Sequence, residues 1–255
     1  MSLVNICIPT YEMHALGKEF LKKSFDVLCT QTFKDFEIII SDHSQNNDIK
    51  DLCEEYVRLL NIKYYKNTEK IGNSSANINN AIKKATGQII KILFQDDFLY
   101  SKTSLEDIVK NFDLQKDHWL VTACTQTKDG VNYILPFYPH YNDKIHIGRN
   151  TISSPSVLTI KREGCVFFDE NLIQRMDCDY YKRCYDSFGQ PKILNTINVV
   201  NRIGPHQITN TRITEKLRER EYQYLLKKYN EIDRRKYVFL KKIKNRLIEI
   251  KKKIY

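Results

Sequence analysis

The chain has 255 residues, is 42% hydrophobic and 28% charged, and carries a formal net charge of +10. This composition is ordinary for a soluble globular protein, and the length fits one large α/β domain with an appendage. No apolar run approaches the ~20 residues of a membrane-spanning helix, which excludes such a helix from this sequence.

The positive charge is unevenly distributed along the chain. Acidic residues mostly precede Asp186, whereas the excess of lysine and arginine gathers toward the C-terminus. A tail that binds nucleic acid would interleave stacking aromatic rings with its lysines, and the lysine-rich run offers only Tyr237, Phe239 and Tyr255. We therefore expect no nucleic-acid partner, and instead an anionic lipid surface or a protein partner for the tail.

The cysteines and the N-terminus favour a cytoplasmic protein with reduced thiols. The seven cysteines are scattered and form no C-x-x-C pair, so neither a disulfide framework nor a structural zinc site is expected. Met1 leads almost directly into a predicted strand, so no signal peptide is expected either.

Hydrophobic periodicity predicts a regular alternation of strands and helices. Short apolar runs predict strands over residues 4–8, 36–40, 62–65, 89–94, 119–127, 156–160 and 193–203. Helical spacing predicts helices over residues 16–30, 49–60, 77–86, 101–113 and 175–187. This order predicts an α/β protein with a Rossmann-like, mostly parallel central sheet flanked by helices, and ligand groups at the strand ends.

Two adjacent carboxylates, Asp96 and Asp97, follow the predicted strand over 89–94. Side chains alternate along a strand, so both cannot stay in the core. A Mg²⁺ or Mn²⁺ ion typically takes one or two carboxylates together with a substrate diphosphate, which predicts a metal-diphosphate platform here. The alternative is that both carboxylates only cap the helix predicted over 101–113.

The role of one long loop is open. The loop over 133–148 is long enough for an acceptor-binding role, and its length is equally compatible with a surface loop that has no such role.

Neither G-x-G-x-x-G after the first strand nor G-x-x-x-x-G-K-[ST] occurs, so a nucleotide would be bound without a glycine-rich phosphate loop.

The C-terminal part differs in composition from the rest of the chain. We expect residues 1–212 to form the α/β domain and residues 213–255 a basic helical extension. The extension has apolar residues in alternating steps of three and four among many lysines, at Leu240, Ile243, Leu247, Ile250 and Ile254. This amphipathic helix could pack on its own domain, pair with a partner helix or lie on an anionic membrane.

Six short segments, taken in order, resemble the family 2 glycosyltransferases of the GT-A fold over about residues 4 to 212. They are Ile8-Pro9-Thr10-Tyr11-Glu12, Ile40-Ser41-Asp42-His43-Ser44, the loop from Gly72 to Asn80, Phe94-Gln95-Asp96-Asp97, Phe168-Asp169-Glu170-Asn171-Leu172 with Met176-Asp177, and His206. The resemblance implies the GT-A fold and transfer of a sugar from a nucleotide sugar.

The resemblance also implies a role for each matching position. The nucleotide would be bound by Pro9, Thr10, Tyr11, Glu12, Asp42, Gly72, Asn73, Asn77, Gln95 and Asp96. In this set, Asp42 would accept from a uracil N–H, and Tyr11 would offer a stacking face. A divalent metal, Mn²⁺ or Mg²⁺, would be held by Asp96, Asp97 and His206.

Asp177 matches the general base of an inverting displacement in this family. Such a base is needed because an acceptor hydroxyl is a poor nucleophile until its proton is removed. The metal and His206 would stabilise the departing nucleoside diphosphate. The alternative is that Asp177 and Asp179 only cap a helix start.

The sequence departs from the family pattern at three positions. Phe94 stands where the D-x-D motif has its first Asp, Asn77 lies near a position where many members carry Arg, and Met176 replaces the Glu beside the base. The metal site therefore has one carboxylate fewer than the motif provides.

The sequence thus predicts an inverting, metal-dependent glycosyltransferase of the bacterial surface-glycan type. We expect a UDP-sugar donor, a glycan or lipid-linked acceptor, and a cytoplasmic location, with membrane contact or self-association through the C-terminal helix. One alternative is a catalytically degenerate GT-A scaffold that acts as a binding module. The other is a nucleotidyltransferase, which would need a glycine-rich, basic loop after the first strand, where residues 9–17 hold one Gly and no Arg.

Overall fold

The computed structural model of the protein describes residues 2–211 and 213–233. The chain divides into two compact units, Met1–Ile213 and Thr214–Tyr255. In the second unit, helix α7 (Glu215–Lys228) starts at Thr214, whose hydroxyl accepts from the Leu217 N–H at 3.2 Å. The amphipathic helix predicted over 240–254 lies outside the described residues.

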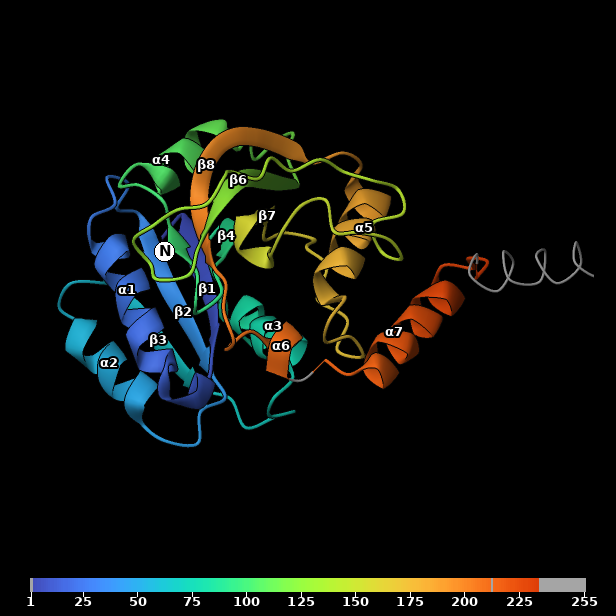
Figure 1. Ribbon diagram of the computed structural model, residues 1–255. Coiled ribbons are helices and arrows are strands. Elements are labelled where there is room, and N and C mark those ends of the chain that lie inside the picture. Colours follow the sequence, from blue (N-terminus) through green and yellow to red (C-terminus); the bar gives the residue numbers. More distant parts are fainter. Residues whose placement is uncertain (1, 212, 234–255) are drawn as a thin grey trace, which may run out of the picture. The chain divides into compact units, whose positions relative to one another are not determined.

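The first unit is built on one mixed sheet whose strands lie in the order β3-β2-β1-β4-β7-β6-β8-β5 (Figure 1). Its first half is parallel and consists of β1 (Val4–Thr10), β2 (Phe36–Asp42), β3 (Ile62–Lys66) and β4 (Ile89–Ile92). The crossovers carry α1 (Gly17–Cys29), α2 (Asp48–Tyr56) and α3 (Ser74–Lys84). Strands β1, β2 and β4 form because their apolar runs are buried on both faces, as in a helix-covered parallel sheet, whereas the edge strand β3 is partly exposed.

The second half of the sheet introduces antiparallel pairs. The strand β7 (Leu158–Lys161) lies antiparallel between β4 and β6 (Trp119–Thr127), and the long strand β8 (Lys192–Arg202) runs parallel to β6. The short strand β5 (Phe98–Leu99) pairs antiparallel with β8 at the edge. The predicted α/β fold class is therefore confirmed, and within it the parallel arrangement is confined to four of the seven strand pairs of the described residues.

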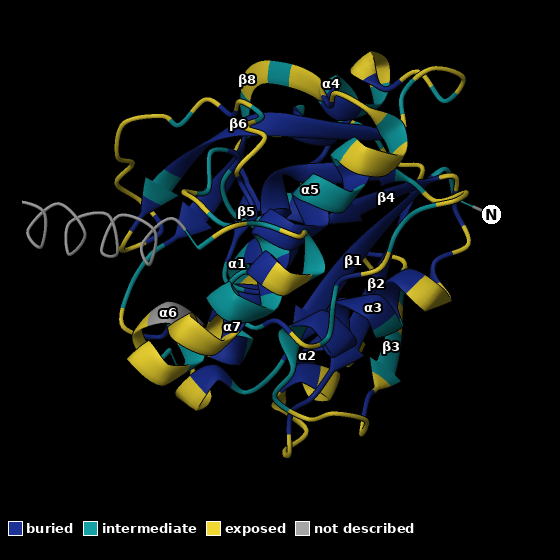
Figure 2. Cartoon of the chain, turned by 90° about the vertical axis from the view of Figure 1, so that its right-hand side faces the viewer, coloured by how far each residue is buried: buried dark blue, intermediate teal, exposed yellow. Residues whose placement is uncertain are grey.

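Among its described residues, the first unit contains five further helical elements. They are α4 (Ser104–Asn111), α5 (Met176–Phe188), α6 (Ile208–Thr211) and the short 3₁₀ helices η1 (Met13–Ala15) and η2 (Pro155–Val157). The central strands are buried, and exposed residues concentrate on the outer helix faces and the loops (Figure 2). All seven cysteines are free, as the sequence predicted. Within the described residues, no helix is both long and apolar enough to span a bilayer.

Several boundaries differ from the sequence prediction, and two of these differences have clear local reasons. Helix α3 begins at Ser74 rather than Asn77, because the Asn73 side chain caps it by accepting from the Ala76 N–H at 2.9 Å. Strand β4 ends at Ile92, and beyond it the Phe94 N–H donates to the Ser156 hydroxyl at 2.8 Å. The chain therefore leaves the sheet before it reaches the two carboxylates.

A close approach at Gly17 fixes the connection between β1 and α1. The Gln95 side chain accepts from the Tyr11 N–H at 2.9 Å and donates to the Gly17 carbonyl at 2.8 Å. A Cβ atom on Gly17 would lie 2.3 Å from the Tyr11 carbonyl oxygen and 2.6 Å from the Gln95 Nε2. Only glycine fits here. Its close approach lets the two hydrogen bonds of Gln95 hold the segments after β1 and β4 together.

We expect Gly17→Ala to lower the free energy of unfolding by about 2 kcal/mol, because its Cβ would overlap backbone that cannot move freely. Gly164→Ala is the matched control: the φ of Gly164 is +71°, nothing lies near its added Cβ, and about 1 kcal/mol of backbone strain is the only expected cost. Urea unfolding of both variants measures the difference. Equal losses would mean that the crowding at Gly17 is relieved by small shifts.

Candidate active site

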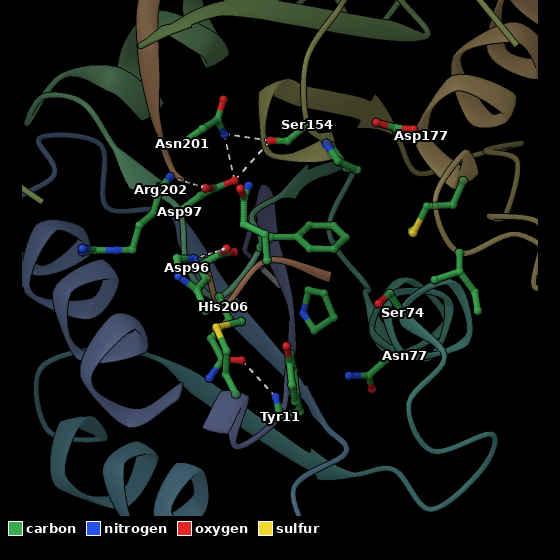
Figure 3. Close-up of a pocket in the computed structure, with 18 of the residues that line it drawn as sticks. Tyr11, Ser74, Asn77, Asp96, Asp97, Ser154, Asp177, Asn201, Arg202 and His206 are labelled. Atoms are coloured by element: carbon green, nitrogen blue, oxygen red, sulfur yellow. Dashed lines mark hydrogen bonds and ion pairs between the residues drawn. The ribbon is translucent and has the colours of Figure 1, made fainter. Parts of the chain in front are cut away.

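One pocket gathers the strand ends and helix starts of the first unit (Figure 3). It lies where β1, β4 and β8 end and where α3 and α5 begin. Nine of the predicted site residues line it, namely Pro9, Tyr11, Gly72, Asn77, Gln95, Asp96, Asp97, Asp177 and His206. The other four, Thr10, Glu12, Asp42 and Asn73, are not part of its wall.

Asp96 and His206 form a pair at one side of the pocket. The Nε2 atom of His206 lies 3.3 Å from the Asp96 Oδ2 atom and is buried without a hydrogen-bond partner among the described residues. The imidazole ring is held by an edge contact with Phe20, at 4.8 Å between ring centroids. A carboxylate oxygen and an imidazole nitrogen so placed are suitable ligands for one divalent cation.

The protein alone supplies few ligands to such an ion. Among the described residues, no group of three or more His, Cys, Asp and Glu side chains is placed to hold a metal. Substrate oxygens would therefore have to complete the coordination of any ion at Asp96 and His206.

Asp97 has a different environment from its neighbour Asp96. Its carboxylate accepts from the Arg202 N–H at 2.9 Å, the Asn201 side chain at 2.8 Å and the Ser154 hydroxyl at 3.1 Å. Burial, followed by the nearby Asp96 charge, raises the pKa of Asp97, while hydrogen bonds from Ser156, the Arg202 N–H and Asn201 lower it. Direct metal binding by Asp97 stays a prediction, and the hydrogen bonds favour a role in positioning the loop.

Asp177 lies across the pocket from Asp96 and His206, on the first turn of α5 (Figure 3). Its two oxygens accept from the Asn150 side chain and from the Cys178 N–H, both at 2.7 Å. Burial raises the pKa of Asp177 to about 6. A carboxylate with this pKa is still largely ionised at neutral pH and is basic enough to accept a proton from a hydroxyl.

Sequence reasoning missed several pocket residues, and two of them, His43 and Ser74, lie beside predicted residues. Each directly follows a residue that was predicted, Asp42 and Asn73. The signal was available in principle, because neighbouring residues at a strand end or a helix start point in different directions. The Nε2 atom of His43 lies 3.1 Å from the Glu69 carbonyl, and burial lowers the pKa of this imidazole.

Asp42 is buried behind the pocket wall. One of its oxygens accepts from Thr10 at 3.0 Å and from the hydroxyl and N–H of Ser44 at 2.6 and 2.9 Å. The other accepts from the Tyr64 hydroxyl at 2.7 Å. A nucleobase would have to displace one of these donors to reach the carboxylate, so nucleobase binding by Asp42 stays a prediction that this arrangement does not favour.

Three of the other predicted nucleotide-binding side chains join structural elements. Asn77 donates to the Thr10 carbonyl at 3.0 Å, and Asn73 donates to the Glu170 carbonyl at 2.8 Å. Gln95 bridges Tyr11 and Gly17, as described above. Glu12 accepts weakly from the Gln45 N–H at 3.3 Å. Asn77 and Gln95 also line the pocket, whereas Asn73 and Glu12 lie outside its wall.

Comparison with known proteins defines the class. The sequence model described as Glycosyl transferase family 2 matches residues 5–172. The chain therefore belongs to glycosyl transferase family 2.

Two curated relatives are similar over part of their length. The chain is 28% identical over 194 residues to an uncharacterized glycosyltransferase of Methanocaldococcus jannaschii, covering 71% of this chain and 64% of that protein. It is 30% identical over 102 residues to the GalNAc(5)-diNAcBac-PP-undecaprenol beta-1,3-glucosyltransferase of Campylobacter jejuni, covering 40% of this chain and 32% of that protein. The matched region thus spans less than two thirds of either relative.

Solved structures share the fold. A structure of S. aureus TarS in complex with UDP has a TM-score of 0.64 at 18% identity, covering 92% of this chain and 73% of that chain. The mannosyltransferase PcManGT from Pyrobaculum calidifontis, in complex with GDP-Man and Mn²⁺, has a TM-score of 0.56 at 15% identity, covering 80% and 57%. At these identities the likeness establishes the GT-A fold alone.

The two adjacent carboxylates should respond differently to the same change. In Asp97→Asn, an amide N–H₂ replaces an oxygen that accepts buried hydrogen bonds, so we expect a loss of about 2 to 3 kcal/mol in unfolding free energy. Asp96→Asn changes a pocket-facing group and should cost less than about 1 kcal/mol. Urea unfolding without added metal measures both, and equal losses would contradict the structural role of Asp97.

Proposed function

We propose that this protein is an inverting, metal-dependent glycosyltransferase that moves a sugar from a nucleotide sugar to a hydroxyl of a glycan or lipid-linked acceptor. The observation that carries the proposal is the placement of two chemical functions in one pocket: Asp96 and His206 on one side, and Asp177 on the other (Figure 3). A donor bound between them would have its leaving group and its attacked face on opposite sides, which leads to inversion.

The residues present fit a divalent cation. Adjacent ligands on an octahedral ion with bonds of about 2.1 Å lie roughly 3 Å apart, and the two candidate ligand atoms of Asp96 and His206 are separated by 3.3 Å. When bound, Mn²⁺ or Mg²⁺ would neutralise charge on the donor diphosphate. The Nε2 atom of His206 is buried next to Asp96 and has no hydrogen-bond partner among the described residues, which supports a role in which it meets the metal or a diphosphate oxygen.

The chain's own residues supply the rest of the chemistry. Asp177 would accept the proton of the acceptor hydroxyl as that oxygen attacks the anomeric carbon. Pro9 and Tyr11 would line the base and ribose, and Gly72 lies on the same wall. Phe94, in place of a carboxylate, gives the wall near Asp96 an apolar surface, so that Asp96 and Asp97 are the two carboxylates of this part of the pocket.

The printed names of similar proteins support the substrate classes. TarS structures contain UDP or UDP-GlcNAc, so we propose a UDP-sugar donor for this chain. The C. jejuni relative is named for an undecaprenol diphosphate-linked acceptor. A lipid-linked acceptor of this kind would place the reaction at the cytoplasmic face of the inner membrane, in surface polysaccharide synthesis.

Metal-dependent nucleotide binding tests the donor side. In isothermal titration we expect one nucleotide among UDP, GDP and CMP, with UDP the first choice, to bind more tightly with Mn²⁺ than with EDTA. Asp96→Ala should lose the gain in nucleotide affinity that Mn²⁺ provides, which we expect to be at least tenfold, and His206→Ala should reduce this gain. Glu106→Ala, a surface carboxylate paired with Lys110, is the control. Absence of binding by all three nucleotides would favour the degenerate binding scaffold.

The role of Asp177 is tested by substitution and by pH. Asp177→Asn should lower the rate of sugar transfer by about 10² to 10⁴, with nucleotide affinity unchanged, because only the base is removed. Since the pKa of Asp177 is about 6 and the base must be ionised, the wild-type rate should fall as pH drops, and be about tenfold lower at pH 5 than at pH 8. Full activity in Asp177→Asn would exclude this residue as the base.

A further inference from the structure

We propose that Asn150 is a positioning residue for Asp177, and that the loop over 150–154 holds the two carboxylates Asp177 and Asp97 in one hydrogen-bonded frame. The inference rests on the proposed role of Asp177 as the base. Asn150 belongs to none of the motifs that the sequence brought out.

The contact between Asn150 and Asp177 is short and oriented. The Nδ2 atom of Asn150 donates to the Asp177 Oδ2 atom at 2.7 Å, and the Cys178 N–H occupies the other oxygen. The Oδ1 atom of Asn150 accepts from the N–H groups of Ile152 and Ser153, both at 2.9 Å. These two donors fix the orientation of the amide, because a flipped side chain would turn its N–H₂ toward them and its oxygen toward the carboxylate.

The loop itself is held in an uncommon backbone conformation. Ser153 has a φ of +101°, which is rare for a residue with a side chain. Its carbonyl accepts from Asn150 at 2.9 Å and from the Tyr181 hydroxyl at 3.1 Å. Hydrogen bonds from both the loop and α5 therefore stabilise the strained residue and place Asn150 against Asp177.

The same loop reaches the carboxylate on the other side of the pocket. The Ser153 hydroxyl donates to the Asn201 Oδ1 atom at 3.1 Å, and the Asn201 Nδ2 atom donates to Asp97 at 2.8 Å. The neighbouring Ser154 hydroxyl also donates to Asp97, at 3.1 Å (Figure 3). A continuous set of contacts therefore runs from Asp177 to the turn that carries Asp96, and it fixes both sides of the pocket against each other.

The surroundings of Asp177 make the Asn150 amide important for its ionisation. Cys178 and Tyr181 of α5 are close to Asp177 and stay neutral, because burial raises the pKa of both side chains. Arg175, ahead of α5, donates to the Gly148 carbonyl at 3.2 Å. The side-chain donor to the Asp177 carboxylate from the facing loop is thus Asn150, and it favours the ionised form.

The test compares Asn150→Ala and Asn150→Asp with Asn142→Asp as the matched control. Asn150→Asp keeps an oxygen for the Ile152 and Ser153 N–H groups, so it preserves the turn while it removes the donor. Asn142 also holds a turn, accepting from the Lys144 N–H at 2.8 Å, but it is exposed and lies elsewhere in the connection between β6 and η2. Two properties are measured: the ¹³C titration of the Asp177 carboxyl, assigned by its loss in Asp177→Asn, and the pH dependence of UDP release from UDP-GlcNAc, UDP-glucose and UDP-galactose.

We expect the pKa of Asp177 to rise by about one unit in Asn150→Ala and by at least as much in Asn150→Asp. A rise of that size would lower the rate of UDP release about fivefold at pH 6 and little at pH 8, with the KM for the donor unchanged. Asn142→Asp should titrate as the wild type does.

The inference is overturned if Asn150→Ala leaves the Asp177 titration unchanged, or if Asn142→Asp shifts it equally. The titration needs no turnover, so its result stands apart from the proposed function. If Asp177→Asn keeps full activity while Asn150→Ala still shifts the titration, the proposed base is wrong although the contact is real.

Discussion

The structure of the pocket depends on the hydrogen bonds to one buried carboxylate, Asp97. This side chain follows β4, in the parallel half of the sheet, and accepts from residues 201 and 202 at the end of β8, in the mixed half. It therefore joins the two halves of the sheet where the pocket opens. Because consecutive side chains point in different directions, anchoring Asp97 in the protein leaves the adjacent Asp96 facing the pocket. Asp97 is thus held by three donors of the protein, whereas Asp96 pairs with His206 at 3.3 Å.

Many side chains at positions that match the family motifs connect structural elements in this chain. Asn79, inside the motif loop, exchanges hydrogen bonds with the backbone of Phe168 at 2.8 and 2.9 Å, and this fastens α3 to the segment that leads to α5. Asn73 and Glu170 reinforce the same junction. A motif can thus identify a family by residues that hold the site together, and not only by those that contact substrate. This explains how the pocket keeps its shape although Phe94 and Met176 replace acidic residues of the family pattern.

The parts of the fold that sequence could predict are those with local signals. The first three strand and helix pairs followed from hydrophobic runs and spacing, and α5 with Asp177 followed from a motif next to helical periodicity. Strand β5 has two residues and exists only because β8 pairs with it, so no local pattern could predict it. In the site, the sequence could not show that Asp97 and not Asp96 accepts these hydrogen bonds, because the donors are more than 50 residues away along the chain. Asn150 escaped for the same reason, since its partner is 27 residues distant.

The distance along the chain between Asp96 and His206 has a consequence for folding. These residues are brought together only after β8 has taken its place in the sheet and the segment beyond it has turned back over Phe20. Contacts of such large sequence separation are costly in loop-closure entropy and form late in folding. A folding intermediate in which only β1, β2, β3 and β4 have formed would already bury a core. It would still lack His206 beside Asp96. Affinity for a cation at this position would therefore distinguish the native state from a compact, incompletely folded one, and the bound ion would stabilise the native state by mass action.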